Sequence, residues 1–225
     1  MKAIIFDFNG TLFYDSHIHA YAWRNFIAKK LGREVSDEEM EYGVQGRSNP
    51  AILTHFLGEG FTPEELERMG HEKEAWYRKE CARRPDELRL AKGAAELFDL
   101  LKEKNIPFAI ATSSEILNVQ FYFNTFGLER WFARDHVVYD DGIMRSKPHP
   151  DIYLKTAAAL GVDMKDCVVF EDSVSGLAAA KVAGAGRIFA VDSLVKPSMY
   201  EGIEGIHKMI RDYSDITIEE IGIDI

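Results

Sequence analysis

The chain has 225 residues, of which 46% are hydrophobic and 12% aromatic, so it can bury the core of one large domain or of two small ones. Its 27 basic and 37 acidic side chains give a formal net charge of −10, and no run of lysine and arginine concentrates positive charge, so we expect no nucleic-acid or membrane partner. No stretch of about 18 apolar residues is present to span a bilayer, and the apolar run before Asp7 is too short for a signal peptide. Together with two distant cysteines, expected to be reduced thiols, the composition predicts a cytoplasmic protein.

Apolar strands and amphipathic helices alternate along most of the chain. Short apolar runs typical of buried parallel strands occur at 3–6, 108–111, 168–170 and 188–191, with a further short strand expected at 209–211. Segments with one apolar face at helical spacing lie at 93–104, 116–126, 152–160 and 174–182. This alternation predicts an α/β fold, a Rossmann-like doubly wound parallel sheet covered by helices.

The segment 15–84 breaks the alternation. It contains no convincing strand, only charged, helix-like stretches at 20–31, 37–43 and 63–84. We interpret it as an α-helical cap domain inserted after the first strand, which leaves 1–14 and 85–225 as the core domain. No exposed apolar stripe stands out in the sequence, so a monomer is expected.

Polar residues follow the first two apolar runs, where a parallel sheet binds its ligands. Asp7 ends the first run, and the turn after it contains Asn9 and a glycine whose backbone allows close approach of an anion. Thr112 and Ser113 end the second run and supply hydroxyl and N–H groups at a helix start. Taken singly, each pattern also suits ordinary turn or helix capping.

Two further clusters lie later in the chain. Lys147 precedes two prolines that rigidify its backbone; beside a nucleophilic carboxylate it would neutralise a transferring phosphoryl group, whereas alone it would be a solvated charge. Glu171 and Asp172 follow the third apolar run, and such paired carboxylates suit Mg²⁺, the alternative being a polar helix start at Ser173.

The order of these four clusters resembles the four motifs of the haloacid dehalogenase superfamily, in particular its β-phosphoglucomutases and small sugar-phosphate phosphatases. The resemblance rests on 7–11, 112–113, 146–153 and 171–185 and extends over nearly the whole chain. It implies a Mg²⁺-dependent phosphoryl-transfer hydrolase, a phosphatase that forms an aspartyl-phosphate on Asp7 and acts on a small phosphorylated metabolite.

The same resemblance assigns roles to individual residues. It implies that Mg²⁺ is held by Asp7, the backbone carbonyl of Asn9 and Asp172, with Glu171 supporting this metal shell. It further implies that the phosphoryl oxygens are held by Thr112, Ser113 and Lys147.

The chain departs from the family pattern at Asn9, where phosphate-ester enzymes have a second aspartate that serves as acid and then as base. An amide cannot transfer that proton, a loss of roughly 10²–10⁴-fold in rate. Three explanations are open: a substrate with a good leaving group, such as an acyl phosphate; a catalytically weak phosphate-binding or sensing protein; or deamidation of the Asn9-Gly10 pair to aspartate.

Three cap residues are candidates for contact with the substrate. His19 and Trp23 lie four residues apart on one face of a predicted helix, at positions similar to those that face the active site in β-phosphoglucomutases, although packing is the alternative for both. Arg47 would bind a second phosphate or remain solvated. Asn49 stands where the mutases have a phosphate-gripping arginine, so a phosphosugar mutase ranks behind a phosphatase.

Overall fold

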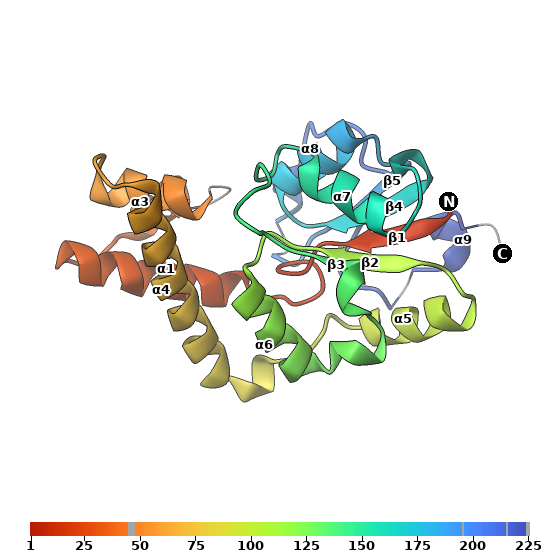
Figure 1. Cartoon of the computed structure of the whole chain (residues 1–225), viewed down its shortest axis with the longest axis horizontal. Helices are drawn as coiled ribbons and strands as arrows, with labels where there is room; N and C mark the ends of the chain where they lie inside the picture. The colour runs from red at the N-terminus through yellow and green to blue at the C-terminus, as the bar shows by residue number, and fades with distance from the viewer. Residues whose placement is uncertain (45–47, 195, 215, 224–225) are drawn as a thin grey trace. The chain divides into compact units, whose positions relative to one another are not determined.

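A computed structural model describes residues 1–44, 48–194, 196–214 and 216–223 (Figure 1). Contacts within the chain divide it into two compact units, which we call the core unit (Met1–Tyr14 and Arg89–Ile225) and the inserted unit (Asp15–Leu88). None of the helices in the described part of the chain combines the length and the apolar composition that a membrane crossing needs.

The core unit contains a parallel sheet. The described residues form six strands in the order β3-β2-β1-β4-β5-β6. Their bounds are β1 (Ala3–Phe6), β2 (Phe108–Ala111), β3 (Val137–Val138), β4 (Cys167–Glu171), β5 (Arg187–Val191) and β6 (Lys208–Ile210). Every residue of β1 is completely buried, as expected for a central strand covered on both faces.

Helices cover both faces of this sheet. They are α5 (Ala94–Glu103), α6 (Ile116–Phe126), α7 (Asp151–Ala159), α8 (Val174–Ala183) and α9 (Ile218–Ile221). Figure 1 shows α7 and α8 on one face and α5 and α6 on the other. Short 3-10 turns join them at η2 (Leu128–Arg130), η3 (Arg134–His136), η4 (Met164–Asp166) and η5 (Pro197–Tyr200). This architecture confirms the predicted α/β fold, a doubly wound parallel sheet with a helical insertion between its first two strands.

The two faces of the sheet carry different cores, because successive strand residues point to opposite sides. Ile5 belongs to an aliphatic cluster that includes Leu177 of α8. Phe6 points the other way into an aromatic cluster, where its ring meets Phe98 of α5 edge-on at 5.3 Å and stacks on Phe170 at 5.2 Å. The apolar runs of the sequence therefore fill the cores on both sides of one sheet.

The inserted unit is helical. Its elements are α1 (Ser16–Leu31), α2 (Asp37–Val44), α3 (Asn49–Leu57), α4 (Pro63–Ala82) and η1 (Pro85–Glu87). Its apolar core includes Trp23, Phe26, Leu53 and Met69. The helix α3 was not among the predicted stretches, and Arg47, a candidate substrate contact, lies outside the described residues.

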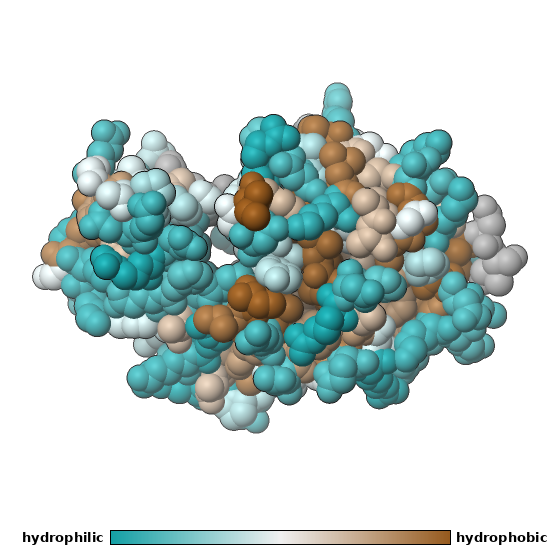
Figure 2. All heavy atoms as spheres, in the orientation of Figure 1, coloured by the Kyte–Doolittle hydropathy of each residue, from teal (hydrophilic) through white to brown (hydrophobic). Residues whose placement is uncertain are grey.

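Hydrophilic side chains dominate the face of the molecule shown in Figure 2, with apolar groups scattered among them. The large exposed apolar side chains come from separate elements, such as Tyr42 of α2, Leu154 of α7 and Val182 of α8. The expectation of a monomer stays a prediction.

Candidate active site

Polar residues that follow the central strands meet at one edge of the sheet. Phe6 of β1 lies opposite Ile110 of β2 and Phe170 of β4 in parallel register. Asp7 follows directly, and its backbone N–H donates to the carbonyl of Phe170 at 2.9 Å. Thr112, just beyond β2, is 1% exposed. Because the carboxyl ends of parallel strands lie side by side, motifs far apart in the sequence converge here.

Lys147 lies between two carboxylates at this edge. Its Nζ donates to Oδ1 of Asp7 and to Oε2 of Glu171, each at 2.7 Å. Burial works against the charge of Lys147, but the two carboxylates outweigh it, and the pKa of the lysine lies well above its usual value. The structure thus holds a fixed positive charge in contact with Asp7.

Both oxygens of Glu171 are engaged by protein groups. Oε2 accepts from Lys147 and from the hydroxyl of Tyr153, while Oε1 accepts from the backbone N–H of Asp172 at 3.1 Å and from the N–H and Oγ of Ser173, each at 2.9 Å. Burial favours the neutral form of Glu171, yet Lys147 and these hydrogen bonds keep its pKa below the usual value. Glu171 is therefore an anchor for the lysine and for the loop after β4.

Within the described residues, Asp7, Glu171 and Asp172 each offer an oxygen within 4.8 Å of the others. Burial and the charge of Glu171 raise the pKa of Asp7 to about 7 and the pKa of Asp172 well above its usual value. Two buried carboxylates and the half-buried Asp172 gather around one lysine, so a bound divalent cation would stabilise their ionised forms. Since Glu171 is engaged by protein donors, the site fits Mg²⁺ held by Asp7 and Asp172.

Three neighbours fix the position of Asp172. Thr11 Oγ1 donates to its Oδ1 at 3.1 Å, and the hydroxyl of Tyr200 donates to its backbone carbonyl at 2.9 Å. Gly10 has φ +78°, and a Cβ at this position would stand 2.0 Å from Oδ2 of Asp172. The glycine after Asn9 is thus required by a positive φ and by close approach of the carboxylate, whereas the sequence carries no signal for Tyr200.

The side chain of Asn9 lies in a cluster of hydroxyl groups. Its Nδ2 donates to the hydroxyl of Tyr122 at 2.8 Å, and its Oδ1 accepts from Ser114 Oγ at 2.8 Å and from Thr112 Oγ1 at 3.5 Å. Ser113, by contrast, is exposed and lines a shallow hollow together with Lys147. The sequence did not point to Tyr122, because a tyrosine on a helix is usually a packing residue.

The inserted unit contains a second buried polar cluster. Nδ1 of His19 lies 3.0 Å from Nζ of Lys73, its Nε2 lies 3.4 Å from Asp15, and its ring stacks on that of Tyr77 at 3.8 Å. Trp23 is 3% exposed, and Lys73 Nζ lies 4.9 Å from the centre of its ring. Sequence patterns identified His19 and Trp23 but not Lys73. The charged residues around Lys73 in the sequence are typical of an exposed helix face, so nothing indicated that it is buried.

Comparison with known proteins defines the class. The model of the haloacid dehalogenase-like hydrolase family matches residues 1–184. The chain therefore belongs to the haloacid dehalogenase-like hydrolases, which confirms the predicted resemblance.

Individual relatives narrow this class to the β-phosphoglucomutase-like members of family IA. The chain is 32% identical to the phosphorylated carbohydrates phosphatase of Thermotoga maritima, over 85% of each protein, and 30% identical to the β-phosphoglucomutase of Bacillus subtilis, over 97% of this chain and 93% of that one. The crystal structure of a family IA, variant 3 hydrolase from Entamoeba histolytica superposes with a TM-score of 0.91 at 38% identity, covering 98% of this chain and 97% of that one.

Proposed function

We propose that this chain is a Mg²⁺-dependent phosphatase that acts on a small phosphorylated metabolite through an aspartyl-phosphate on Asp7. The observation that carries the proposal is the placement of Lys147, 2.7 Å from both Asp7 and Glu171, next to the carboxylate of Asp172. Enzymes catalyse phosphoryl transfer mainly by positioning groups and neutralising charge, and this cluster is suited to both. The Thermotoga relative, a phosphatase by name, supports the same class of reaction.

In the proposed reaction, a carboxylate oxygen of Asp7 attacks phosphorus while the bond from phosphorus to the leaving-group oxygen breaks. Water then attacks the phosphorus of the aspartyl-phosphate, which releases inorganic phosphate and restores the carboxylate. Lys147 and the hydroxyls of Thr112 and Ser113 hold the phosphoryl oxygens during both steps. The positive charge of Lys147 and the hydrogen bonds of the two hydroxyls stabilise the negative charge of the phosphoryl oxygens in the transition state.

Mg²⁺ would be held by Asp7, Asp172 and the backbone carbonyl of Asn9, and it would supply further positive charge against the phosphoryl oxygens. Glu171 contributes by anchoring the loop that carries Asp172 and by holding Lys147. Burial and the charge of Glu171 raise the pKa of Asp7 to about 7, so protons compete with the metal and we expect Mg²⁺ to bind more weakly below neutral pH.

We also propose that the inserted segment 15–84 is the cap domain that selects the substrate, with His19, Trp23 and Arg47 as contacts. Burial of Trp23 and the contacts of His19 within the inserted unit leave packing as the alternative for these two side chains. Because the Thermotoga relative is named for phosphorylated carbohydrates, carbohydrate-like phosphates belong in any substrate panel.

The test is phosphate release from a panel of sugar phosphates, acyl phosphates and p-nitrophenyl phosphate with Mg²⁺. We expect native protein to turn over at least one compound, Asp7→Ala to lower the rate by several orders of magnitude, and a chelator to stop the reaction. Asp163→Ala, at an exposed aspartate of the core unit, is the control. Equal rates for native protein and Asp7→Ala would refute the proposal, and binding of phosphate compounds without turnover would favour the sensing protein.

A phosphosugar mutase is the second candidate, favoured by the similarity to the Bacillus β-phosphoglucomutase along nearly the whole chain. A mutase returns the phosphoryl group to another hydroxyl of a sugar and needs a bisphosphate to load Asp7. Activity that depends on added sugar bisphosphate and yields an isomeric sugar phosphate would identify it. Release of inorganic phosphate without any bisphosphate would identify the phosphatase.

A further inference from the structure

The amide of Asn9 is held in one orientation by hydroxyl groups. Nδ2 donates to Tyr122, and Oδ1 accepts from Ser114, both at 2.8 Å, with Thr112 Oγ1 at 3.5 Å from the same oxygen. Ser114 Oγ also lies 3.2 Å from the hydroxyl of Tyr122, which closes a ring of polar contacts. Both ends of the amide thus have hydrogen-bond partners, so the side chain of Asn9 is held in place in this pocket.

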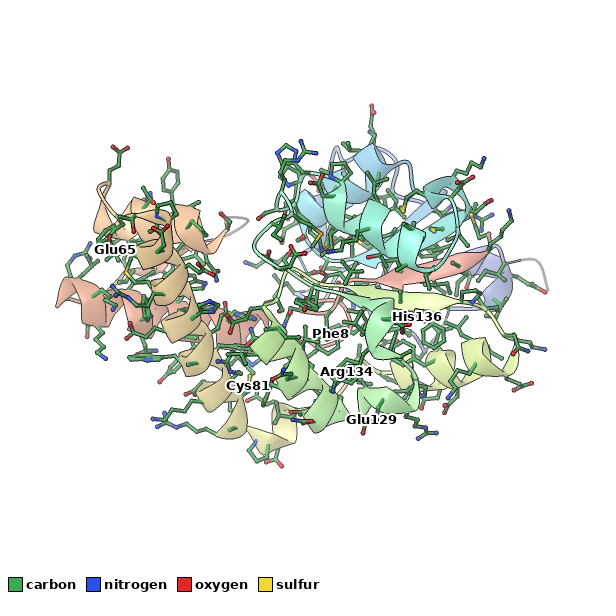
Figure 3. All side chains as sticks on the ribbon, viewed as in Figure 1. Phe8, Glu65, Cys81, Glu129, Arg134 and His136 are labelled. Atoms are coloured by element: carbon green, nitrogen blue, oxygen red, sulfur yellow. The ribbon has the colours of Figure 1, made fainter. Side chains whose placement is uncertain are left out.

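Tyr122 is placed to position Asn9. The tyrosine is 1% exposed, lies on α6 and stacks on Phe8 with ring centres 4.4 Å apart; Figure 3 shows Phe8 between the sheet and that helix. Its hydroxyl is engaged by Asn9 and Ser114. Tyr122 therefore acts through Asn9, and we treat it as a positioning residue.

A fixed amide next to Asp7 has a chemical consequence. Alkyl phosphates release an alkoxide almost as basic as hydroxide, so they need a proton from the enzyme. Acyl phosphates release a carboxylate whose conjugate acid has a pKa of about 4, like that of an aspartate side chain. Such a group departs as the anion, so no proton from position 9 is needed.

We infer that the substrate of this site is a small metabolite phosphorylated on a carboxylate, an acyl phosphate, an inference that rests on the proposed phosphatase function. Asp7 attacks phosphorus, the bond between phosphorus and the acyl oxygen breaks, and the substrate leaves as its carboxylate with no proton transferred. The new bond on Asp7 is itself an acyl phosphate.

The second half-reaction is then the slow one. The departing group is the carboxylate of Asp7, which needs no acid, but the attacking water has no base at position 9 to take its proton. The aspartyl-phosphate accumulates during turnover. Substrates with different good leaving groups therefore share one steady-state rate, that of hydrolysis of this common intermediate.

The experiment measures single-turnover and steady-state kinetics with Mg²⁺ for acetyl phosphate, p-nitrophenyl phosphate, phenyl phosphate and a hexose 6-phosphate. Peptide mass spectrometry first verifies that position 9 is asparagine. For native protein we expect phosphorylation of Asp7 by acetyl phosphate to exceed that by the hexose phosphate by their full uncatalysed difference, because no acid at position 9 supplies the roughly 10²–10⁴-fold that would help the hexose alkoxide depart. We also expect a burst of about one p-nitrophenolate per protein molecule, because release of the nitrophenolate precedes the slow step.

Two variants separate the roles within the pocket. Asn9→Asp should accelerate phosphorylation of Asp7 by the hexose phosphate roughly 10²-fold or more beyond any change in phosphorylation by acetyl phosphate, and it should speed hydrolysis of the aspartyl-phosphate from either substrate. Tyr122→Phe should leave the dependence of the phosphorylation rate on leaving-group pKa unchanged, because Tyr122 holds the amide of Asn9 and gives no proton to the leaving group.

Several results would overturn the inference. Single-turnover rates of Asp7 phosphorylation in native protein that hardly vary with leaving-group pKa would do so, and a steeper dependence in Tyr122→Phe would make Tyr122 the acid instead. Asp7→Ala separates this failure from failure of the proposed function. If that variant loses all activity while the leaving-group dependence is flat, the phosphatase stands and the acyl phosphate inference falls.

Discussion

Lys147 in the core unit and Lys73 in the inserted unit are both buried lysines, with side chains 7% and 1% exposed. Lys147 contacts two carboxylates, those of Asp7 and Glu171. Lys73 contacts the carboxylate of Glu74 at 2.8 Å and lies 3.0 Å from Nδ1 of His19. A buried charge is stable only with partners of opposite charge or with hydrogen bonds. The charges of each cluster must therefore find such partners within their own unit or in a ligand.

The two clusters differ in their balance of charge. In the core unit, a third carboxylate, that of Asp172, joins Asp7 and Glu171 around one lysine, and burial together with the charge of Glu171 raises the pKa of Asp7 and of Asp172. In the inserted unit, Lys73 is paired with Glu74, and Asp15 lies 3.4 Å from His19 in the same cluster. The core cluster thus gathers three carboxylates that offer oxygens to one metal ion, whereas the carboxylates of the inserted cluster are engaged by Lys73, His19 and Tyr77.

The largest effect is expected from Lys147→Met. Removing a positioned cation at the phosphoryl group should lower phosphate release by roughly 10²–10³-fold. It should also destabilise the fold, since Asp7 and Glu171 remain buried without it, and Mg²⁺ should restore part of the lost stability. Thermal unfolding with and without Mg²⁺ checks this, with Lys155→Met, at an exposed position on α7, as the control. A variant whose activity matches that control would contradict the role of Lys147.

Lys73→Met tests the other lysine. Breaking a buried ion pair by removing one partner costs about 3–5 kcal/mol, so we expect the free energy of unfolding to fall by this amount with no rescue by Mg²⁺. Lys79→Met, at an exposed position on α4, is the matched control. Chemical denaturation measures both. If Mg²⁺ stabilised Lys73→Met as strongly as Lys147→Met, the two clusters would not differ in the way their charges indicate.

Gly10→Ala tests whether Mg²⁺ binding depends on the close approach of the Asp172 carboxylate to the backbone at position 10. A Cβ here would stand 2.0 Å from Oδ2 of Asp172, so the carboxylate must move, and Mg²⁺ affinity should fall roughly 10–100-fold. Gly32→Ala is the control, because Gly32 also has positive φ, +66°, yet a Cβ there meets nothing within 4 Å. The Mg²⁺ concentration for half-maximal activity distinguishes them. Equal values for both alanine variants would show that the close approach of the Asp172 carboxylate to Gly10 does not govern Mg²⁺ binding.

Much of the fold could be predicted from the sequence because its central strands are wholly apolar. The runs at 3–6 and 108–111 correspond to β1 and β2 without a shift. The strand β3 was missed because Val137–Val138 is too short to show a pattern. The helix α3 was missed because Asn49–Leu57 is mostly apolar along its length rather than on one face, so it lacks the periodicity that marks a surface helix.

The candidate site was only partly predictable, for a physical reason. Asp7 and Asp172 follow strands whose shared edge can be inferred from the order of the chain. Tyr122 and Tyr200 reach the same site from helical segments, and their hydroxyl contacts depend on packing that no local pattern encodes. The roles of all these residues in catalysis stay predictions until the variants are measured.

The smallest expected effect concerns two helix starts, one in each unit. The side chain of Thr62 accepts from the N–H of Glu65, which is labelled in Figure 3, and the side chain of Thr217 accepts from the N–H of Glu220. In each pair the glutamate carboxylate accepts in turn from the backbone N–H of the threonine. Replacing such a cap by alanine costs about 1 kcal/mol. If the units unfold together, Thr62→Ala and Thr217→Ala should lower one common transition by similar amounts. If they unfold separately, calorimetry should show Thr62→Ala shifting only the transition of the inserted unit, the same transition that Lys73→Met lowers and Mg²⁺ leaves in place.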